Sequence, residues 1–182
     1  MPRLQPGDQA PDVALYSPDG TLIRTADLWR DRPVLLNFFR HFGCIHCKDL
    51  LAQLRQENPR IVEAGARTIG VFQGSPGNVG NHCRERSVPF ECLSDAGGEG
   101  YDAFGLERSG VTTWLSPATV VKGLKLYRRG LTTGLPHTGQ DVRQMPGTFV
   151  VSKGGRVRLA HYNRDPADNP SLDVLLGALG AS

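Results

Sequence analysis

The stretch PVLLNFFRHFGCIHCKDL, residues 33–50, decides how this chain is expected to fold. Its first part, residues 33–39, is a near-continuous apolar run, which is typical of a central strand buried on both faces. From residue 45 to 58, leucines recur at the spacing of one helix face. Cys44 and Cys47 therefore stand where a buried strand gives way to a helix.

Strand and helix patterns alternate on both sides of this stretch. The patterns predict a hairpin at residues 13–23, strands at 67–72 and 89–93, a second hairpin at 147–151 and 156–162, and helices at 76–87, near 100–106, at 117–129 and from 170 onward. Pro59 is expected to kink or restart the helix that begins at residue 45, and Gly65 to end it. Helices between core strands predict one domain over residues 1–182, an α/β/α three-layer sandwich with a mixed sheet and an N-terminal β-hairpin.

The composition is that of an ordinary globular protein. The chain has 182 residues, of which 39% are hydrophobic and 21% charged. Its net charge of +3 is spread along the sequence, so we expect no nucleic-acid partner. The sequence shows no signal peptide and no apolar run of the roughly 18 residues that a membrane span needs, so we expect a cytoplasmic protein without a membrane partner. In that reducing compartment, four cysteines argue against a disulfide framework.

The two closely spaced cysteines have the environment of a redox pair. The first turn of a helix carries unpaired N–H groups and a partial positive charge, which stabilise a thiolate. A C-x-x-C spacing brings two sulfur atoms to disulfide distance, and a strand-to-helix C-x-x-C within a βαβ pattern is typical of thioredoxin-like redox sites. Arg40, His41 and His46 add positive or titratable groups nearby. We therefore interpret Cys44 and Cys47 as a redox pair.

Other interpretations of the cysteines and histidines carry less weight. A zinc or copper site at Cys44 and Cys47 needs two more ligands, and no histidine has a clear ligand spacing. Two inert buried cysteines are the remaining alternative for this position. Cys83 and Cys92 are expected to be plain packing residues, with a redox role as the lesser alternative. His137 is expected to be a loop histidine without a role.

Several segments together resemble the alkyl hydroperoxide reductase/thiol-specific antioxidant superfamily, within the thioredoxin fold. They are PGDQAPDVAL (6–15), the Asp19-Gly20 turn, DLWRDRPVLLNFF (27–39) with the cysteine pair, FECLSDAGGEGYDAFGL (90–106) and QMPGTFVVSKGGRVRLAHYNRDPADNP (144–170). The last resembles a peroxiredoxin-like branch that carries C-x-x-C. The resemblance implies a thioredoxin-like fold and a cysteine that attacks a peroxide or a disulfide, without a dissociable cofactor. It also implies a thioredoxin-like or glutathione-based reductant, and it is compatible with a homodimer.

Two overlays of the site compete. By the thioredoxin pattern, Cys44 is the nucleophile and Cys47 the resolving cysteine. By the peroxiredoxin pattern, Cys47 takes the peroxidatic place, and Cys44 stands where those enzymes carry Thr or Ser. A thiol is a weaker hydrogen-bond donor than that hydroxyl. We prefer Cys44 as the nucleophile by a small margin.

A second departure from the peroxiredoxin pattern concerns an arginine. Peroxiredoxins carry an active-site arginine just before the strand that matches residues 147–151, and this chain has Met145-Pro146 there. Pro146 resembles the cis-proline that packs against the cysteine pair in the thioredoxin family, so we predict a cis bond at Met145–Pro146. Arg40 or Arg143 could supply the missing charge, although an ordinary solvated role is expected for each.

These observations lead to one main hypothesis and one alternative. The main hypothesis is a thiol-dependent oxidoreductase that reduces peroxides or disulfides through Cys44 and Cys47 and is regenerated by an external dithiol. The alternative is a redox-sensing or metal-handling protein that binds copper or zinc with the same C-x-x-C. The sequence does not determine the substrate, the reductant or the oligomeric state.

Overall fold

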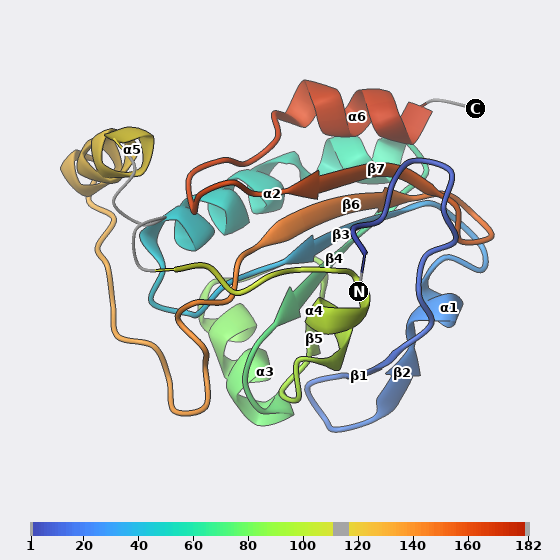
Figure 1. Ribbon diagram of the computed structural model, residues 1–182, viewed down its shortest axis with the longest axis horizontal. Coiled ribbons are helices and arrows are strands. Elements are labelled where there is room, and N and C mark those ends of the chain that lie inside the picture. The colour runs from blue at the N-terminus through green and yellow to red at the C-terminus, as the bar shows by residue number, and fades with distance from the viewer. Residues whose placement is uncertain (1, 111–116, 181–182) are drawn as a thin grey trace.

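The computed structural model describes residues 2–110 and 117–180, and its centre is a seven-stranded mixed sheet (Figure 1). The strands lie in the order β2-β1-β5-β4-β3-β6-β7. Their bounds are β1 Ala14–Tyr16, β2 Leu22–Arg24, β3 Val34–Phe38, β4 Arg67–Phe72, β5 Glu91–Ser94, β6 Gly147–Val151 and β7 Val157–Tyr162. The pairs β3–β4 and β4–β5 are parallel, and the pairs that involve β1, β2, β6 or β7 are antiparallel. The predicted thioredoxin-like α/β fold with an N-terminal hairpin is confirmed.

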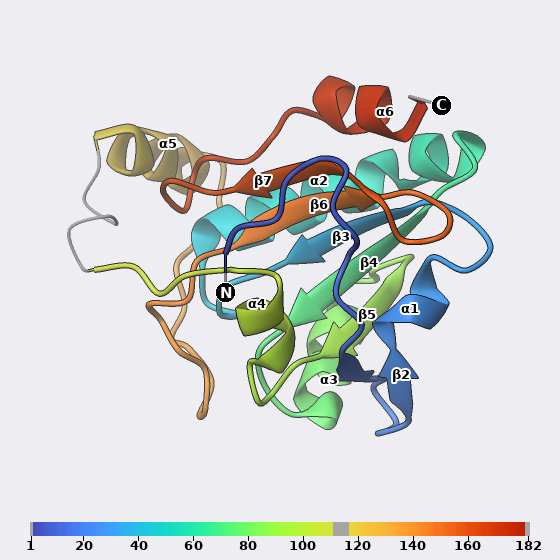
Figure 2. The same ribbon diagram turned by 45° about the vertical axis from the view of Figure 1, so that its right-hand side comes forward.

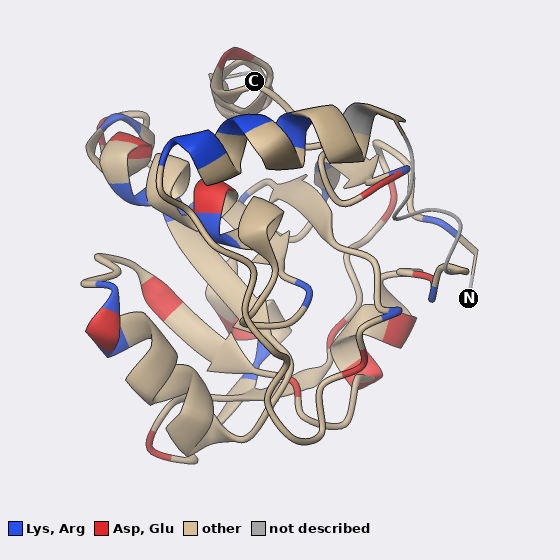
Figure 3. Cartoon of the chain, turned by 90° about the vertical axis from the view of Figure 1, so that its left-hand side faces the viewer, with Lys and Arg blue, Asp and Glu red and all other residues tan. Residues whose placement is uncertain are grey.

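Helices cover both faces of the sheet (Figures 1 and 2). They are α1 Thr25–Leu28, α2 Ile45–Glu63, α3 Pro76–Glu85, α4 Glu99–Ala103, α5 Pro117–Arg128 and α6 Leu172–Gly180. Side chains of α2, α3 and α6 form one core with the sheet, and those of α1 and α4 form a second core on the other face. α5 lies beyond the edge of these layers and packs against α2 (Figures 1 and 3).

The central strand β3 places the cysteine motif at one end of the sheet. All five of its residues are buried, because the strand has a neighbour on each side and a core on each face. Its residues pair with those of β4 in parallel and with those of β6 in antiparallel register. The backbone N–H of Phe39 still donates to the carbonyl of Val71 at 2.9 Å. Residues 40–47 therefore leave the sheet at the carboxyl ends of its parallel strands, where open α/β sheets place their sites.

Helix α2 continues through Pro59. The proline lies inside one continuous helix and does not restart it. Leu54 and Ile61, which precede and follow the proline, are both almost fully buried in the same core. Packing on both sides of Pro59 offsets the missing hydrogen bond. Gly65 ends the helix as predicted, with a φ of +77°.

The predicted cis bond at Met145–Pro146 is wrong, because none of the described peptide bonds is cis. The two residues directly precede β6. The N–H of Met145 donates to the carbonyl of Glu107 at 3.0 Å, and the carbonyl of Pro146 accepts from the N–H of Asn163 at 3.4 Å. A trans bond keeps the chain in register between these two partners.

Cys83 and Cys92 form a disulfide, which the sequence analysis did not expect. Cys83 lies on α3 and Cys92 on β5, as the strand and helix patterns predicted. α3 packs on β5, and the Cα atoms of Cys83 and Cys92 are 6.8 Å apart, within disulfide range. The bridge fastens α3 to the sheet, and both cysteines belong to the core that also contains the cysteine pair of α2.

Candidate active site

Cys44 and Cys47 occupy the start of α2, where the sequence placed them. Cys44 is the residue at the N-cap, with extended backbone angles, and Cys47 lies in the first turn. Both are free thiols, and their exposed fractions are 4% and 8%. The first helical hydrogen bond runs from the N–H of Lys48 to the carbonyl of Cys44 at 3.0 Å. The sulfur of Cys44 is therefore close to the unpaired N–H groups of the helix start.

Arg40 supplies a buried positive charge beside this sulfur. Its side chain is 5% exposed, and Nη1 lies 3.6 Å from Sγ of Cys44. The rest of the guanidinium donates to backbone carbonyls: Nε to Gln144 at 3.2 Å and Nη2 to Val142 at 2.5 Å. These bonds fix the guanidinium where its charge faces the thiol. The solvated role that the sequence favoured for Arg40 is wrong.

The two thiols have pKa values that move in opposite directions. The thiol of Cys47 donates a hydrogen bond to Cys44, and this bond and the charge of Arg40 outweigh burial and lower the pKa of Cys44 to about 6. The pKa of Cys47 is raised well above 9.0, first by the same hydrogen bond and then by burial and the neighbouring negative charge. At neutral pH this geometry holds Cys44 as the thiolate and Cys47 as the thiol.

A segment of residues 131–140, which we name the cover segment, lies over the start of α2. The N–H of Gly134 donates to the carbonyl of Gly43 at 2.9 Å, and Nζ of Lys48 donates to the carbonyl of Thr132 at 2.8 Å. The contact is so close that a Cβ added at Gly43 would lie 2.1 Å from the carbonyl oxygen of Gly134. The cover segment therefore contacts the residue just before Cys44 and the residue just after Cys47.

Two histidines sit beside Cys47 in a small cavity of about 10 Å³. His41 was a predicted site residue, and burial and the charges of Arg40 and Lys48 lower its pKa to about 4. His82 comes from α3, and burial is the main cause that lowers its pKa to about 3. Both imidazoles are neutral at pH 7. His41 therefore lines the site as an uncharged group.

Three other predicted site residues have contacts with other parts of the chain. His46 is 4% exposed and faces α5, where a Cβ added at Gly123 would lie 3.7 Å from its Nε2. Arg143 is exposed, and its Nε lies 3.6 Å from Asp141. Pro146 lines a separate pocket whose described lining contains neither cysteine. The structure thus brings Arg40 and His41 to the cysteine pair and leaves His46, Arg143 and Pro146 outside it.

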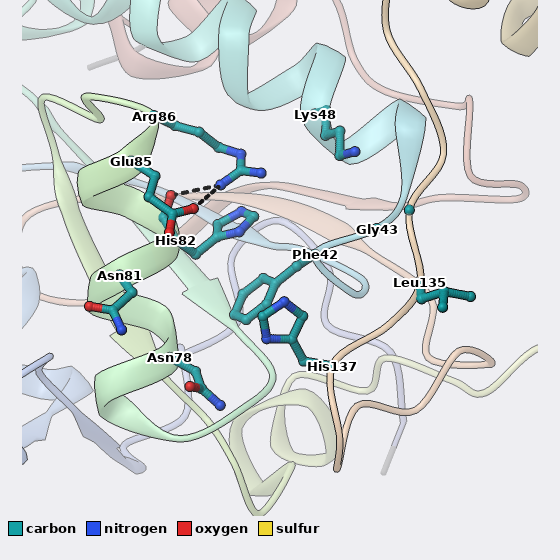
Figure 4. A pocket seen from close by; sticks show the side chains of 11 residues that line it. Phe42, Gly43, Lys48, Asn78, Asn81, His82, Glu85, Arg86, Leu135 and His137 are labelled. Atoms are coloured by element: carbon teal, nitrogen blue, oxygen red, sulfur yellow. Dashed lines mark hydrogen bonds and ion pairs between the residues drawn. The ribbon is translucent and has the colours of Figure 1, made fainter.

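The sequence analysis missed a polar pocket next to the cysteine motif, with a volume of about 280 Å³ (Figure 4). Its described lining comes from the start of α2, from α3 and from the cover segment. The ring of Phe42 stacks on His82 at 4.0 Å and meets His137 edge-on at 5.0 Å, so both imidazoles converge on one phenyl ring. His137 therefore lines this pocket, while its expected lack of a role stays a prediction. Nothing in its loop sequence distinguishes it from a solvated histidine.

The described residues show no arrangement typical of a metal centre. No group of three or more His, Cys, Asp or Glu side chains among them is placed to hold an ion. The ring Nδ1 of His41 is buried and lacks a hydrogen-bond partner within the described part of the chain. His41 lies close to Cys47, but His41 and the two cysteines fall short of the four protein ligands of a structural zinc site.

Comparisons with known proteins agree with this geometry. The chain is 27% identical to the prostamide/prostaglandin F synthase of Danio rerio, over 90% of this chain and 82% of that protein. It is 24% identical to the chloroplastic thioredoxin-like protein AAED1 of Arabidopsis thaliana, over 94% of this chain and 71% of that protein. The crystal structure of peroxidoxin BcpB from Mycobacterium tuberculosis shares the fold, with a TM-score of 0.66, 21% identity and 97% of each chain covered. The AhpC/TSA family matches residues 6–160, and the chain belongs to this family of peroxiredoxin-like thiol oxidoreductases.

Proposed function

We propose that this chain reduces peroxides with Cys44 as the nucleophile and Cys47 as the resolving cysteine. The Cys44 thiolate attacks one peroxide oxygen, the O–O bond breaks, and the leaving oxygen takes a proton to become an alcohol or water. Cys44 becomes a sulfenic acid. The Cys47 thiol then attacks the Cys44 sulfur, and water leaves as the disulfide forms. An external dithiol, thioredoxin-like or glutathione-based, reduces this disulfide by thiol–disulfide exchange.

The observation that carries the proposal is the pairing of Cys44 with two hydrogen-bond donors. The guanidinium of Arg40 and the thiol of Cys47 both point at the same sulfur and stabilise its charge. Cys47 stays protonated, so the group that must later attack the sulfenic acid is already within hydrogen-bond contact of Cys44. The geometry therefore favours the thioredoxin-like assignment of the two roles over the peroxiredoxin overlay.

Burial of the pair favours a peroxide over a protein disulfide as the oxidising substrate. Cys44 is only 4% exposed, and the cover segment contacts the residue just before it. A hydroperoxide group is small and can reach a sulfur through a narrow opening. A disulfide in another protein must bring its own backbone close to the attacking sulfur, which this burial opposes.

The proposal is tested with the fully reduced protein and one equivalent of hydrogen peroxide. We expect the Cys44–Cys47 disulfide to form faster than a free-thiol control is oxidised, as measured by quenching with an alkylating agent and mapping the cysteines by mass spectrometry. The Cys47→Ser variant should accumulate a sulfenic acid at Cys44, which a sulfenic-acid-specific reagent labels. The Cys44→Ser variant should lose the fast reaction.

Two outcomes would contradict the proposal in different ways. A sulfenic acid at Cys47 in the Cys44→Ser variant, formed at the wild-type rate, would reverse the two roles. Oxidation of the wild-type protein at the rate of the free-thiol control would remove the peroxidase activity itself. The same mapping must distinguish Cys83 and Cys92 from the pair, because full reduction also opens their disulfide and peroxide can form it again.

A further inference from the structure

The outer face of α5 and the cover segment concentrate the exposed apolar side chains of the molecule. Of the nine large hydrophobic residues that are exposed in the described part of the chain, five lie between residues 120 and 135. They are Val120, Val121, Leu124, Tyr127 and Leu135, and Leu135 is the most exposed, at 88%. A concentration of exposed apolar side chains in one part of the surface marks a candidate contact with a partner or a membrane.

This apolar stripe is not the face by which α5 packs on the rest of the protein. Leu126 is 2% exposed and packs inward, and Nζ of Lys122 donates to the carbonyl of Ala167 at 2.8 Å. The helix is therefore already anchored. Val120, Leu124 and Tyr127 follow the i, i+4, i+7 spacing of a single helix face, and that face points to solvent.

Positive charge runs alongside the stripe. No acidic residue occurs from Arg108 to Gln140, while this stretch contains five of the lysines and arginines of a chain whose net charge is only +3. Lys125 and Arg128 are one helical turn apart and exposed, next to the apolar row. Figure 3 shows the basic positions along α5, on the side of the molecule where this helix lies.

We propose that α5 docks on an anionic phospholipid surface and lies in the headgroup layer with its apolar stripe inserted. A short helix that combines an apolar face with flanking basic residues and no acidic ones has the pattern of an interfacial helix. Anionic lipid headgroups complement the positive charge, and acyl chains complement Val120, Leu124 and Tyr127. This docking differs from a membrane span, because no described helix is long and apolar enough to cross a bilayer.

Other occupants of the surface fit the observations less well. A second copy of the chain would face this surface with an equally positive one, because both copies carry Lys125 and Arg128, and like charges repel. Nucleic acid would complement the charge but would leave the valine and leucine side chains of the stripe exposed. An anionic bilayer satisfies both the charge and the apolar surface.

Docking through α5 would bring the start of α2 and the cover segment close to the lipid. α5 packs against α2 near the cysteine pair, since Gly123 faces His46, two residues after Cys44. The chain then continues from α5 into the cover segment, where the N–H of Gly134 donates to the carbonyl of Gly43. The exposed Leu135 projects from this same segment (Figure 4). The docking proposal stands on these contacts and does not depend on the peroxidase activity.

The test is co-sedimentation of the full chain with phospholipid vesicles. We expect binding to phosphatidylcholine vesicles that contain about 30% phosphatidylserine, and little binding to phosphatidylcholine alone, because each basic residue near the surface adds about 1 kcal/mol. The Lys125→Gln/Arg128→Gln variant should then bind about thirtyfold more weakly. The Leu124→Ser/Tyr127→Ser variant should lose binding at any salt concentration. Leu22→Ser/Val174→Ser is the matched control, since these two residues are 52% and 51% exposed elsewhere on the surface, and it should bind like the wild type.

Several results would overturn the docking proposal. These are equal binding to the two kinds of vesicle, no binding to either, or a loss of binding in the control as large as in the α5 variants. A dimer that sediments as such and dissociates in the Leu124→Ser/Tyr127→Ser variant would instead assign the stripe to a second copy. The rate at which Cys44 reacts with hydrogen peroxide in solution should be the same in every variant, so a defect in docking is distinguishable from a defect in chemistry.

Discussion

Nη1 of Arg40 lies 3.6 Å from Sγ of Cys44, and the exposed fractions of the two side chains are 5% and 4%. A guanidinium presents several N–H donors in a fixed plane, so one of them donates to the sulfur while the others bind elsewhere. It also contacts the carbonyl groups of Val142 and Gln144, which come from the chain just before β6. The side chain of Arg40 therefore contacts both the start of α2 and the segment that in peroxiredoxins carries the active-site arginine.

Replacing Arg40 should raise the pKa of Cys44 and slow its reaction at neutral pH. In the Arg40→Met variant we expect the alkylation midpoint of Cys44 to rise from about 6 toward the ordinary 9.0, because the guanidinium charge and hydrogen bond are lost. The measurement is the rate of alkylation of Cys44 between pH 5 and 10, mapped by mass spectrometry. Arg143→Met is the matched control, since its exposed side chain pairs with Asp141 and should leave the midpoint unchanged. An unchanged midpoint in Arg40→Met would contradict the proposed role of this residue.

Acid should destabilise the fold through its buried histidines. Burial lowers the pKa of His82 to about 3 and that of His41 to about 4, from 6.5 in the unfolded chain. Below pH 6.5 the unfolded state binds more protons than the folded state, so the free energy of unfolding falls as the pH falls toward 3 or 4. Each histidine adds a slope of up to about 1.4 kcal/mol per pH unit in this window.

The His82→Phe variant isolates this contribution, because phenylalanine can keep the stack on Phe42. In this variant, the free energy of unfolding, measured with urea between pH 4 and 7, should depend less steeply on pH than in the wild type. Asn81→Ala, on the same helix and without a titratable group, should keep the wild-type dependence. If His82→Phe and Asn81→Ala show equal slopes, His82 does not titrate in the way its burial implies.

The fold was predictable because its signals are local and repeated along the chain. The apolar runs of β3 and β6 follow from burial on both faces of the sheet. The structure places β3, β6 and β7 within one residue of their predicted bounds. The errors arose where tertiary contacts outweigh a local rule. Pro59 stays helical because core packing continues on both sides of it. The Met145–Pro146 bond is trans, and Met145 and Pro146 themselves pair with Glu107 and Asn163.

The site was predictable only as far as the chain brings residues together by itself. Arg40, His41 and the cysteine pair are neighbours in sequence, so the strand–loop–helix segment carries them to one place. His82, His137 and the backbone carbonyls that hold Arg40 come from distant segments, and no periodicity marks them. The same limit explains Cys83 and Cys92, because a disulfide between a helix and a strand depends on how α3 packs against β5.

The Cys83–Cys92 disulfide should contribute measurably to stability. The two residues are nine positions apart, and closing a loop of this length in the unfolded chain is expected to contribute about 3 kcal/mol. In the Cys83→Ala/Cys92→Ala variant, the free energy of unfolding measured with urea should be lower by that amount. Dithiothreitol should lower the free energy of unfolding of the wild type toward that of the variant. The variant itself should not respond to dithiothreitol, apart from any effect on the cysteine pair of α2. A wild-type protein that is unaffected by reduction would show that α3 is held to β5 by packing alone.

The cover segment should control access to Cys44, and Gly43 is the residue through which this can be tested. A Cβ at Gly43 would lie 2.1 Å from the carbonyl oxygen of Gly134, so the Gly43→Ala variant must displace the segment from the start of α2. We expect a loss of about 1–3 kcal/mol in the free energy of unfolding and faster alkylation of Cys44 by bulky reagents. Gly77→Ala is the control, because a Cβ there has no described atom within 4 Å, and it should be neutral or stabilise α3 by up to about 1 kcal/mol. Equal alkylation rates in Gly43→Ala and Gly77→Ala would mean that the cover segment does not limit access, and that the burial of Cys44 comes from α2 and the sheet alone.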